Sequence, residues 1–255
     1  MADLFDEVEE QLRSDRYRMI ARKAAPWVLA MLALALVVAL GVWGWQRYQT
    51  QTTDKASEQY TDALAALAQG NAAKAEPLLT EVAKSPAKAF KSLALQQLAG
   101  IKIASGKPED VNAAVVLLDQ AATAAPNDVL ADAARLKSAF AVLDSAPYKE
   151  VEGRLTPLTK DGRPYRVQAR EALGFAKLMA GDTAGARGDF VIIEQSLDAP
   201  EGARQRARAA KDLIDSGSAK AVPAAVRAAV ALPPPAMGLP PGAQLQQPPQ
   251  GPAPQ

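Results

Sequence analysis

The chain contains no cysteine and no histidine, and aromatic residues make up only 5% of its 255 residues. Without cysteine there can be no disulfide, no thiolate metal site and no cysteine nucleophile. Without histidine the commonest general base and the commonest transition-metal ligand are missing. The net charge of +1 gives no sign of a nucleic-acid partner. The sequence has no phosphate-binding glycine loop and no catalytic set, so we expect a protein that is not an enzyme and needs no cofactor or metal.

Residues 26–45 are apolar and carry no charge. A helix rises about 1.5 Å per residue, so this run reaches about 30 Å, the thickness of a bilayer core. Trp27 lies at one end of the run, and Trp43 and Trp45 lie at the other. Amphipathic rings at both ends suit the two headgroup zones of a membrane. The sequence therefore predicts a transmembrane helix over 26–45.

The charges on the two sides of this run are unequal. The preceding segment, residues 1–25, carries five basic residues close to the run, namely Arg13, Arg16, Arg18, Arg22 and Lys23. Over the same distance downstream there are only Arg47 and Lys55. Because positive residues stay on the cytoplasmic side, we expect a cytoplasmic N-terminus and an external C-terminal domain.

Two other interpretations of the apolar run are possible. A cleaved secretory signal usually has a core of about 7–15 residues and a small-residue cleavage site. This run is longer and is followed by a poor cleavage site, and 25 residues precede it. A buried core helix is the third reading. The length and the flanking residues favour a retained anchor.

From residue 54 to 216 one helical pattern follows another, with no strand alternation. The helices expected are 54–69, 71–84, 87–105, 109–124, 128–143, 148–159, 165–180, 183–196 and 200–215. Prolines stand at 86, 126, 164 and 200, each at the entry to a helix pair. A pair repeated at this spacing is typical of an α-solenoid, in which each pair buries its apolar stripe against the next. Outside the folded domain, residues 218–255 are rich in alanine and proline and are expected to be a disordered tail.

Two of the pairs fit the tetratricopeptide pattern of small and aromatic residues. The better copy has Leu173, Gly174, Gly181, Ala186 and Phe190, and the second has Leu98, Gly106 and Ala114. In this alignment Gly174 and Ala186 are the small residues where two helices touch. The early aromatic is missing from both copies, and the pair at 128–159 fits poorly. A generic helical repeat therefore remains the alternative to a tetratricopeptide-like domain.

The same alignment predicts a binding groove on the concave side of the repeats. The residues expected to face it are Gln96, Ile103, Gln168, Glu171, Phe175 and Met179. Phe175 and Met179 are four residues apart and would form an apolar patch for an extended or helical segment. The alternative is that both of these residues belong to the core.

Over residues 1–216 the chain resembles the ancillary subunit family of the bacterial SecYEG translocon. The resemblance is carried by the order and spacing of four stretches: residues 70–79, 154–158, 169–174 followed by Gly181-Asp182, and 199–202 followed by Arg206-Ala207. It implies a single-pass protein of the bacterial inner membrane with a periplasmic tetratricopeptide-like domain. It also implies contact with SecYEG and with a membrane-anchored periplasmic chaperone of the peptidyl-prolyl isomerase type.

The leading hypothesis is thus a membrane-anchored scaffold that links the translocon to periplasmic chaperones through protein–protein interaction. The alternative is a tetratricopeptide adaptor of cell-envelope assembly, such as peptidoglycan or division-site coordination. Both share the same fold and topology, so the residues themselves do not separate them.

Overall fold

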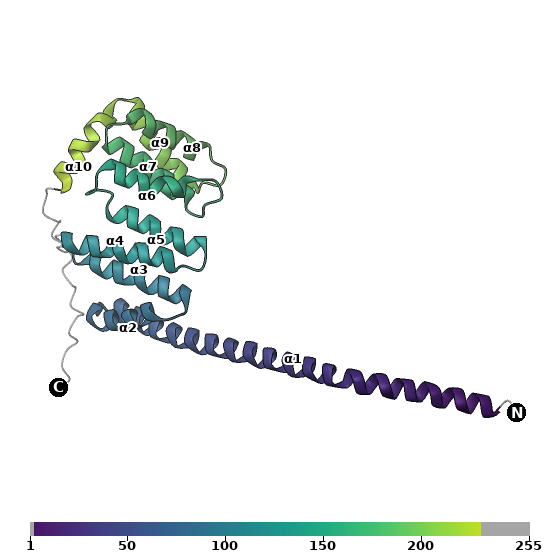
Figure 1. The fold of residues 1–255 in the computed structure, drawn as a ribbon. Coiled ribbons are helices and arrows are strands. Elements are labelled where there is room, and N and C mark those ends of the chain that lie inside the picture. The colour runs from purple at the N-terminus through teal and green to yellow at the C-terminus, as the bar shows by residue number, and fades with distance from the viewer. Residues whose placement is uncertain (1–2, 231–255) are drawn as a thin grey trace, which may run out of the picture. The chain divides into compact units, whose positions relative to one another are not determined.

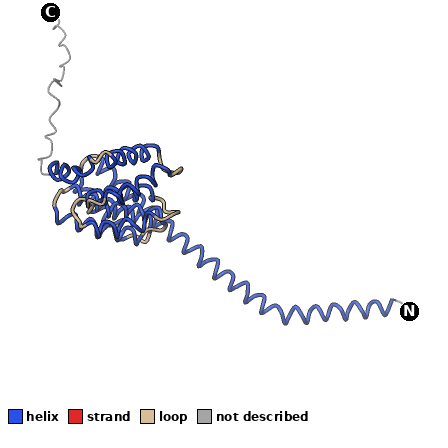
Figure 2. The backbone as a smooth tube through the Cα atoms, turned by 90° about the horizontal axis from the view of Figure 1, so that it is seen from above, coloured by secondary structure: helices blue, strands red, loops and turns tan. Residues whose placement is uncertain are grey.

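The computed structural model describes the backbone of residues 3–230 and the side chains of 26–228 other than Val28 and Arg227. Within this range every regular element is helical, as Figure 2 shows, so the all-α prediction is confirmed. The chain divides into two compact units. Of the described residues, the first unit comprises 3–146 and 153–166, and the second comprises 147–152 and 167–230.

The first element, α1, is a single helix that runs from Asp3 to Ala68 (Figure 1). It joins the predicted anchor and the predicted first helix of the repeat domain without a break. The polar stretch between them is also helical, and its threonine hydroxyls bond to carbonyls of the same helix. Thr50 Oγ1 donates to the Gln46 carbonyl at 3.0 Å, and Thr52 Oγ1 donates to the Tyr48 carbonyl at 3.0 Å. By length and composition, α1 is long and apolar enough to cross a membrane.

Four further helices complete the helical stack of the first unit. They are α2 (Ala72–Lys84), α3 (Lys88–Ala104), α4 (Pro108–Ala124) and α5 (Asp128–Ala141). Side-chain caps mark the starts of α2 and α5, because the first amides of a helix lack partners within it. Asn71 accepts from the Lys74 amide at 3.0 Å, and Asn127 accepts from the Leu130 amide at 3.1 Å. Gly70 makes the preceding turn with φ of 72°.

The core of the first unit is built from thin, alanine-rich faces. The last turns of α1 pack against α2 and α3 through Ala56, Ala63, Leu79, Val82 and Leu98, all buried. Alanine at these contacts lets the helix backbones approach closely, so few bulky side chains are needed to fill the space. The stripe on α1 begins at Ala56, about three turns beyond the end of the apolar run, which ties the folded unit closely to the predicted anchor.

The second unit contains α7 (Arg166–Met179), α8 (Thr183–Gln195) and α9 (Glu201–Asp215). Gly181, with φ of 87°, makes the turn between α7 and α8, a conformation that favours glycine. Asp182 then caps α8 by accepting from the Gly185 amide at 2.8 Å. Phe190 and Ile193 of α8 are buried against alanines of α9 and form the centre of this unit.

Two expectations about helix ends were wrong. The single helix predicted over 148–159 is α6 (Tyr148–Leu155) followed by a 3₁₀ turn, η1 (Thr156–Thr159). Pro157 lies in the first positions of η1, and its missing amide cannot continue the α-helical bonding.

The expected disordered tail also begins too early at residue 218. Residues Ser218–Ala221 form a second 3₁₀ turn, η2, and Val222–Val230 form α10. Ala219 is 2% exposed and belongs to the apolar cluster of the second unit. The folded domain therefore extends past 216, because Ala219 at the start of this segment is buried before its proline-rich part begins. Residues 231–255 lie outside the described part of the chain.

Candidate partner-binding groove

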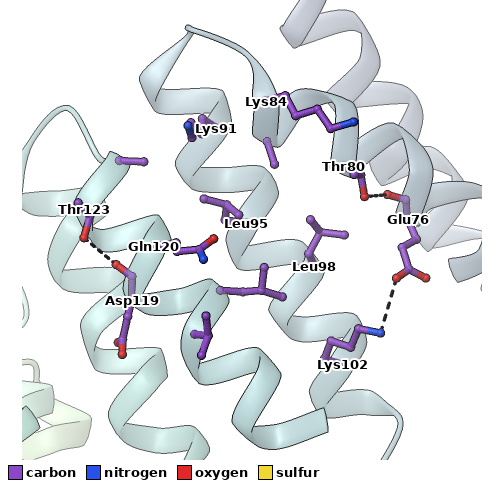
Figure 3. Close-up of a pocket in the computed structure, with 14 residues that line it drawn as sticks. Glu76, Thr80, Lys84, Lys91, Leu95, Leu98, Lys102, Asp119, Gln120 and Thr123 are labelled. Carbon is purple, nitrogen blue, oxygen red and sulfur yellow. Dashed lines mark hydrogen bonds and ion pairs between the residues drawn. The ribbon is translucent and has the colours of Figure 1, made fainter.

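An apolar groove of about 940 Å³ crosses α2, α3 and α4 in the first unit (Figure 3). Its apolar lining consists of Ala83 from α2, Leu95 and Leu98 from α3, and Val116, Leu117 and Ala124 from α4. Val116 is 54% exposed, a large fraction for a valine in a helix that is otherwise packed on both sides. The groove thus offers a strip of apolar surface that neighbouring helices of the same unit do not cover.

The rim of this groove is basic. Lys84, Lys91 and Lys102 stand around the apolar lining. Lys102 Nζ lies 3.7 Å from a Glu76 carboxylate oxygen, and Lys84 Nζ lies 2.7 Å from Glu81. The hydrogen bond from Lys84 lowers the pKa of Glu81 below its ordinary value. Helix α3 itself carries three lysines and no acidic residue, so the face it gives to the groove is positive.

Most other polar groups at the groove already have partners. Thr80 Oγ1 donates to the Glu76 carbonyl at 2.8 Å, and Thr123 Oγ1 donates to the Asp119 carbonyl at 3.0 Å. The Asp119 carboxylate accepts from Ser138 Oγ at 2.8 Å and from Arg154 at 3.3 Å. The groove therefore has no reactive acid–base pair. Its chemistry suits the binding of an apolar segment that carries negative charge.

Buried polar contacts hold α3, α4 and α5 in place behind the groove. Ser92 Oγ donates to the Ala121 carbonyl at 2.9 Å and so joins α3 to α4. Gln96 Oε1 accepts from Lys137 Nζ at 3.0 Å and joins α3 to α5. Gln96 is only 6% exposed, so its predicted place in a binding groove was wrong. Its amide is used inside the unit because a lysine 41 positions later reaches it.

The six predicted groove residues are divided between the two units. Gln96 and Ile103 lie in the first unit, whereas the other four lie on α7 in the second. Ile103 is 41% exposed but does not line the groove of α2–α4. Gln168 is exposed on α7. These residues therefore fall into two groups, one in each unit.

On α7, Glu171 already has a strong partner within the second unit. Its carboxylate accepts two hydrogen bonds from Arg206 of α9, at 2.6 and 2.9 Å, and these raise the pKa of Arg206. Phe175 is 38% exposed and Met179 is 37% exposed. The Phe175 ring also contacts the Phe190 ring edge to face, with centroids 5.1 Å apart. Phe175 is thus shared between the core and the surface.

The predicted repeat-packing residues lie at helix contacts and turns. Leu98, Ala114, Leu173, Gly174, Ala186 and Phe190 are buried, and Gly106 and Gly181 have positive φ at the turns between paired helices. The sequence predicted that Gly174 packs against Ala186, and this was wrong in detail. A Cβ added there would lie 3.0 Å from two ring atoms of Phe190 and 3.5 Å from the Asp189 Cβ. The small residue leaves room for the phenyl ring rather than for Ala186.

The membrane-related residues all lie on α1. The side chains of Trp27, Trp43 and Trp45 are 76%, 66% and 64% exposed. Such exposure of large aromatic rings has no role in the packing of the unit and is consistent with interfacial positions in a bilayer. The predicted topology charges lie outside the described side chains: Arg13, Arg16, Arg18, Arg22 and Lys23.

Sequence reasoning missed several ionic residues that join helices. Asp189 of α8 is 5% exposed and accepts from Arg170 at 3.2 Å and Lys177 at 2.7 Å, both on α7. Asp132 of α5 is fully buried and paired with Arg163. The sequence signal that could have indicated these ion pairs is an aspartate on the expected apolar face of a helix. Among the described residues, no group of acidic side chains is arranged to hold a metal ion.

The described residues form antiparallel helix pairs joined by glycine turns, with an apolar groove and no assembled catalytic set. These features define a repeat-type binding domain. Domains of this class are typically adaptors. The family described as tetratricopeptide repeat-like domain matches residues 22–213, and the chain belongs to it. No curated protein and no solved structure matches the chain.

Proposed function

We propose that this protein is a single-pass scaffold of the bacterial inner membrane that associates with the SecYEG translocon and brings periplasmic chaperones to it. The observation that carries the proposal is the uncovered apolar groove of α2–α4 with its lysine rim. A repeat domain that leaves such a strip open within its own unit has a surface suited to another polypeptide.

The chemistry of the groove narrows the kind of segment that fits it. An amphipathic helix or extended stretch would place its apolar side chains on Leu95, Leu98 and Val116. Acidic residues on its flanks would lie near Lys84, Lys91 and Lys102. Electrostatic complementarity of this kind adds specificity and speeds association more than it adds affinity. The expected occupant is therefore an apolar segment with acidic flanks, presented by a periplasmic domain of a partner protein.

Two further features support the choice of partners. Helix α1 is long and apolar enough to span a membrane, and it leads directly into the repeat domain. The resemblance of residues 1–216 to the ancillary translocon subunits supports SecYEG and a membrane-anchored chaperone of the peptidyl-prolyl isomerase type as the partners. Confining all three to one membrane raises their effective concentration, so even a modest groove affinity suffices.

A negative charge placed in the groove should weaken the binding of the partner proteins. We expect Val116→Glu to reduce the recovery of translocon subunits and the chaperone about tenfold in affinity purification from mild detergent, read by mass spectrometry. When a partner segment covers the groove, the glutamate carboxylate would lose its hydrating water against the apolar lining, and this cost opposes binding. Val129→Glu is the matched control, since Val129 is 51% exposed on α5 and outside the groove. Equal recovery with both variants would place the partner elsewhere, and recovery of cell-wall synthases instead would favour the envelope-assembly adaptor.

The anchor and its orientation make a separate prediction. We expect the full-length protein to stay in the membrane pellet after alkaline washing, because residues 26–45 are held by the bilayer core rather than by charges. A reporter that is active only outside the cytoplasm should be active when fused after Gln255. Release of a chain that starts near Gln46 would show cleavage, and an inactive fusion would reverse the topology.

A further inference from the structure

The turn between α2 and α3 lies beside the part of α1 that directly follows the apolar run. Pro86, in this turn, lines two small hollows against α1. One hollow is lined on the α1 side by Gln49 and Thr53, and the other by Thr52, Lys55, Ala56 and Gln59. These two hollows therefore mark the edge of the first unit that is nearest to the predicted anchor.

The distance from this edge to the apolar run is short. With a rise of about 1.5 Å per residue, Gln49 lies about 6 Å and Thr53 about 12 Å beyond Trp45. The headgroup layer on each side of a bilayer is about 5–8 Å thick. A continuous helix joins Trp45 to both residues, so the separation is fixed by helix geometry rather than by a flexible linker. The α2–α3 turn is thereby held at the level of the headgroups or just above them.

This edge carries a group of lysines that we call the basic collar: Lys55, Lys84 and Lys88. All three line the hollows around Pro86. From residue 82 to 108 the chain has five lysines and no acidic residue. Glu81 is the single carboxylate that lines the hollows, and Lys84 and Lys55 both lower its pKa. Asp54 and Glu58 of α1 line neither hollow. The collar is therefore left with positive charge toward the membrane side.

We propose that the basic collar rests on the membrane surface and binds the headgroups of anionic phospholipids. The inference builds on the membrane anchor of the proposed function, but it does not depend on which partner occupies the groove. It also holds for either orientation of α1, because the collar adjoins the same end of the apolar run in both. An anionic bilayer is favoured over a protein partner because the anchor itself brings the collar to the lipid surface in every molecule.

The absence of cysteine allows a direct test with single labels on the full-length protein. Ala89→Cys and Ala104→Cys place a fluorophore at the two ends of α3, about 22 Å apart by helix rise. The protein is reconstituted in nanodiscs of phosphatidylcholine, alone or with one phosphatidylglycerol in three. A quencher attached to a lipid headgroup reports contact with the surface. We expect strong quenching at Ala89→Cys in the anionic discs, weaker quenching in the neutral discs, and little at Ala104→Cys in either.

A pair of matched double variants tests whether the lysines cause the contact. Each lysine near an anionic surface increases the equilibrium constant for contact with that surface about fivefold. The double variant Lys55→Gln with Lys88→Gln should therefore weaken the contact between the collar and the lipid about 25-fold. Lys74→Gln with Lys107→Gln is the control. It removes two lysines that are also exposed, one near the start of α2 and one directly before α4. None of these four lysines lines the groove, so partner binding is not disturbed. Added salt should reduce the quenching as the collar variant does.

The first measurement is co-elution of protein and lipid, which shows whether the chain has inserted into the nanodisc. A chain that does not insert would overturn the anchor and this inference together. An inserted chain with equal quenching at both labels, or with no dependence on phosphatidylglycerol, would overturn the lipid contact alone. The same conclusion would follow if the collar variant and its control gave equal quenching. Quenching that depends on phosphatidylglycerol and is lost only in the collar variant would establish the contact.

Discussion

Replacing Phe190 by alanine should destabilise the second unit by about 3–5 kcal/mol. The side chain is fully buried at the centre of the packing between α7, α8 and α9. Its ring lies against Gly174 and meets the Phe175 ring at 64°. Removing the ring would leave a cavity that the neighbouring alanines are too small to fill. The loss is measured by denaturant unfolding of the full-length protein in detergent.

Hydrogen exchange shows which helices are destabilised and distinguishes this loss from unfolding of the whole protein. Amides of α7–α9 should exchange faster in Phe190→Ala, while those of α3 and α4 keep their protection, because the two units have separate cores. Leu197→Ala is the matched control, since Leu197 is 96% exposed and its truncation should change stability by less than about 0.5 kcal/mol. Unchanged exchange in α7–α9 would mean that Phe190 does not organise this unit.

The second large effect should come from breaking the buried ion pair of α5. The Asp132 carboxylate is fully buried and accepts from Arg163 and, at 2.9 Å, from Arg135. The hydrogen bond to Asp132 raises the pKa of Arg163, whose guanidinium also lies 3.2 Å from Asp128. Arg163→Leu would leave a buried carboxylate with one partially exposed partner, and we expect a loss of about 3 kcal/mol. Arg163 is 24% exposed, so solvent screening keeps the loss at the low end of the usual range.

A double-mutant cycle separates the pair from the packing around it. Asp132→Leu combined with Arg163→Leu should recover most of the lost stability, because no buried charge then lacks its counterion. Thermal and denaturant unfolding of the four proteins give the coupling energy. Strictly additive losses would show that the two side chains act independently, in spite of their contact in the structure.

Local sequence signals predicted most helix starts and turns. Asn71, Asn127 and Gly181 act through neighbouring amides or through their own backbone, so their effect is visible in a few residues of sequence. The continuity of α1 was not predicted, since threonine-rich stretches usually weaken helices. Thr50 and Thr52 are nevertheless helical here and donate their hydroxyls to carbonyls one turn earlier in the same helix.

The candidate site was much harder to predict than the fold. Whether Gln96 faces a groove or the interior depends on Lys137, which is distant in sequence and adjacent only after folding. The groove of α2–α4 arises from faces that neighbouring helices leave open. Helix periodicity marks an apolar face such as that of Leu95, but it does not show whether another helix covers it. Alignment to a repeat pattern therefore placed Gln96 in the groove and did not identify Val116.

The continuity of α1 also has a consequence for how the first unit forms. Starting a helix in water is unfavourable because several residues must be ordered for one hydrogen bond, whereas extending an existing helix is easy. In the proposed membrane-anchored protein, residues 26–45 are helical in the bilayer first, and the stretch up to Ala68 elongates from this preformed nucleus. Helices α2 and α3 then meet a template whose packing stripe is already in place. The proposed anchor thus makes membrane insertion the first folding step of the repeat domain, and we expect a domain cut free at Gln46 to fold more slowly.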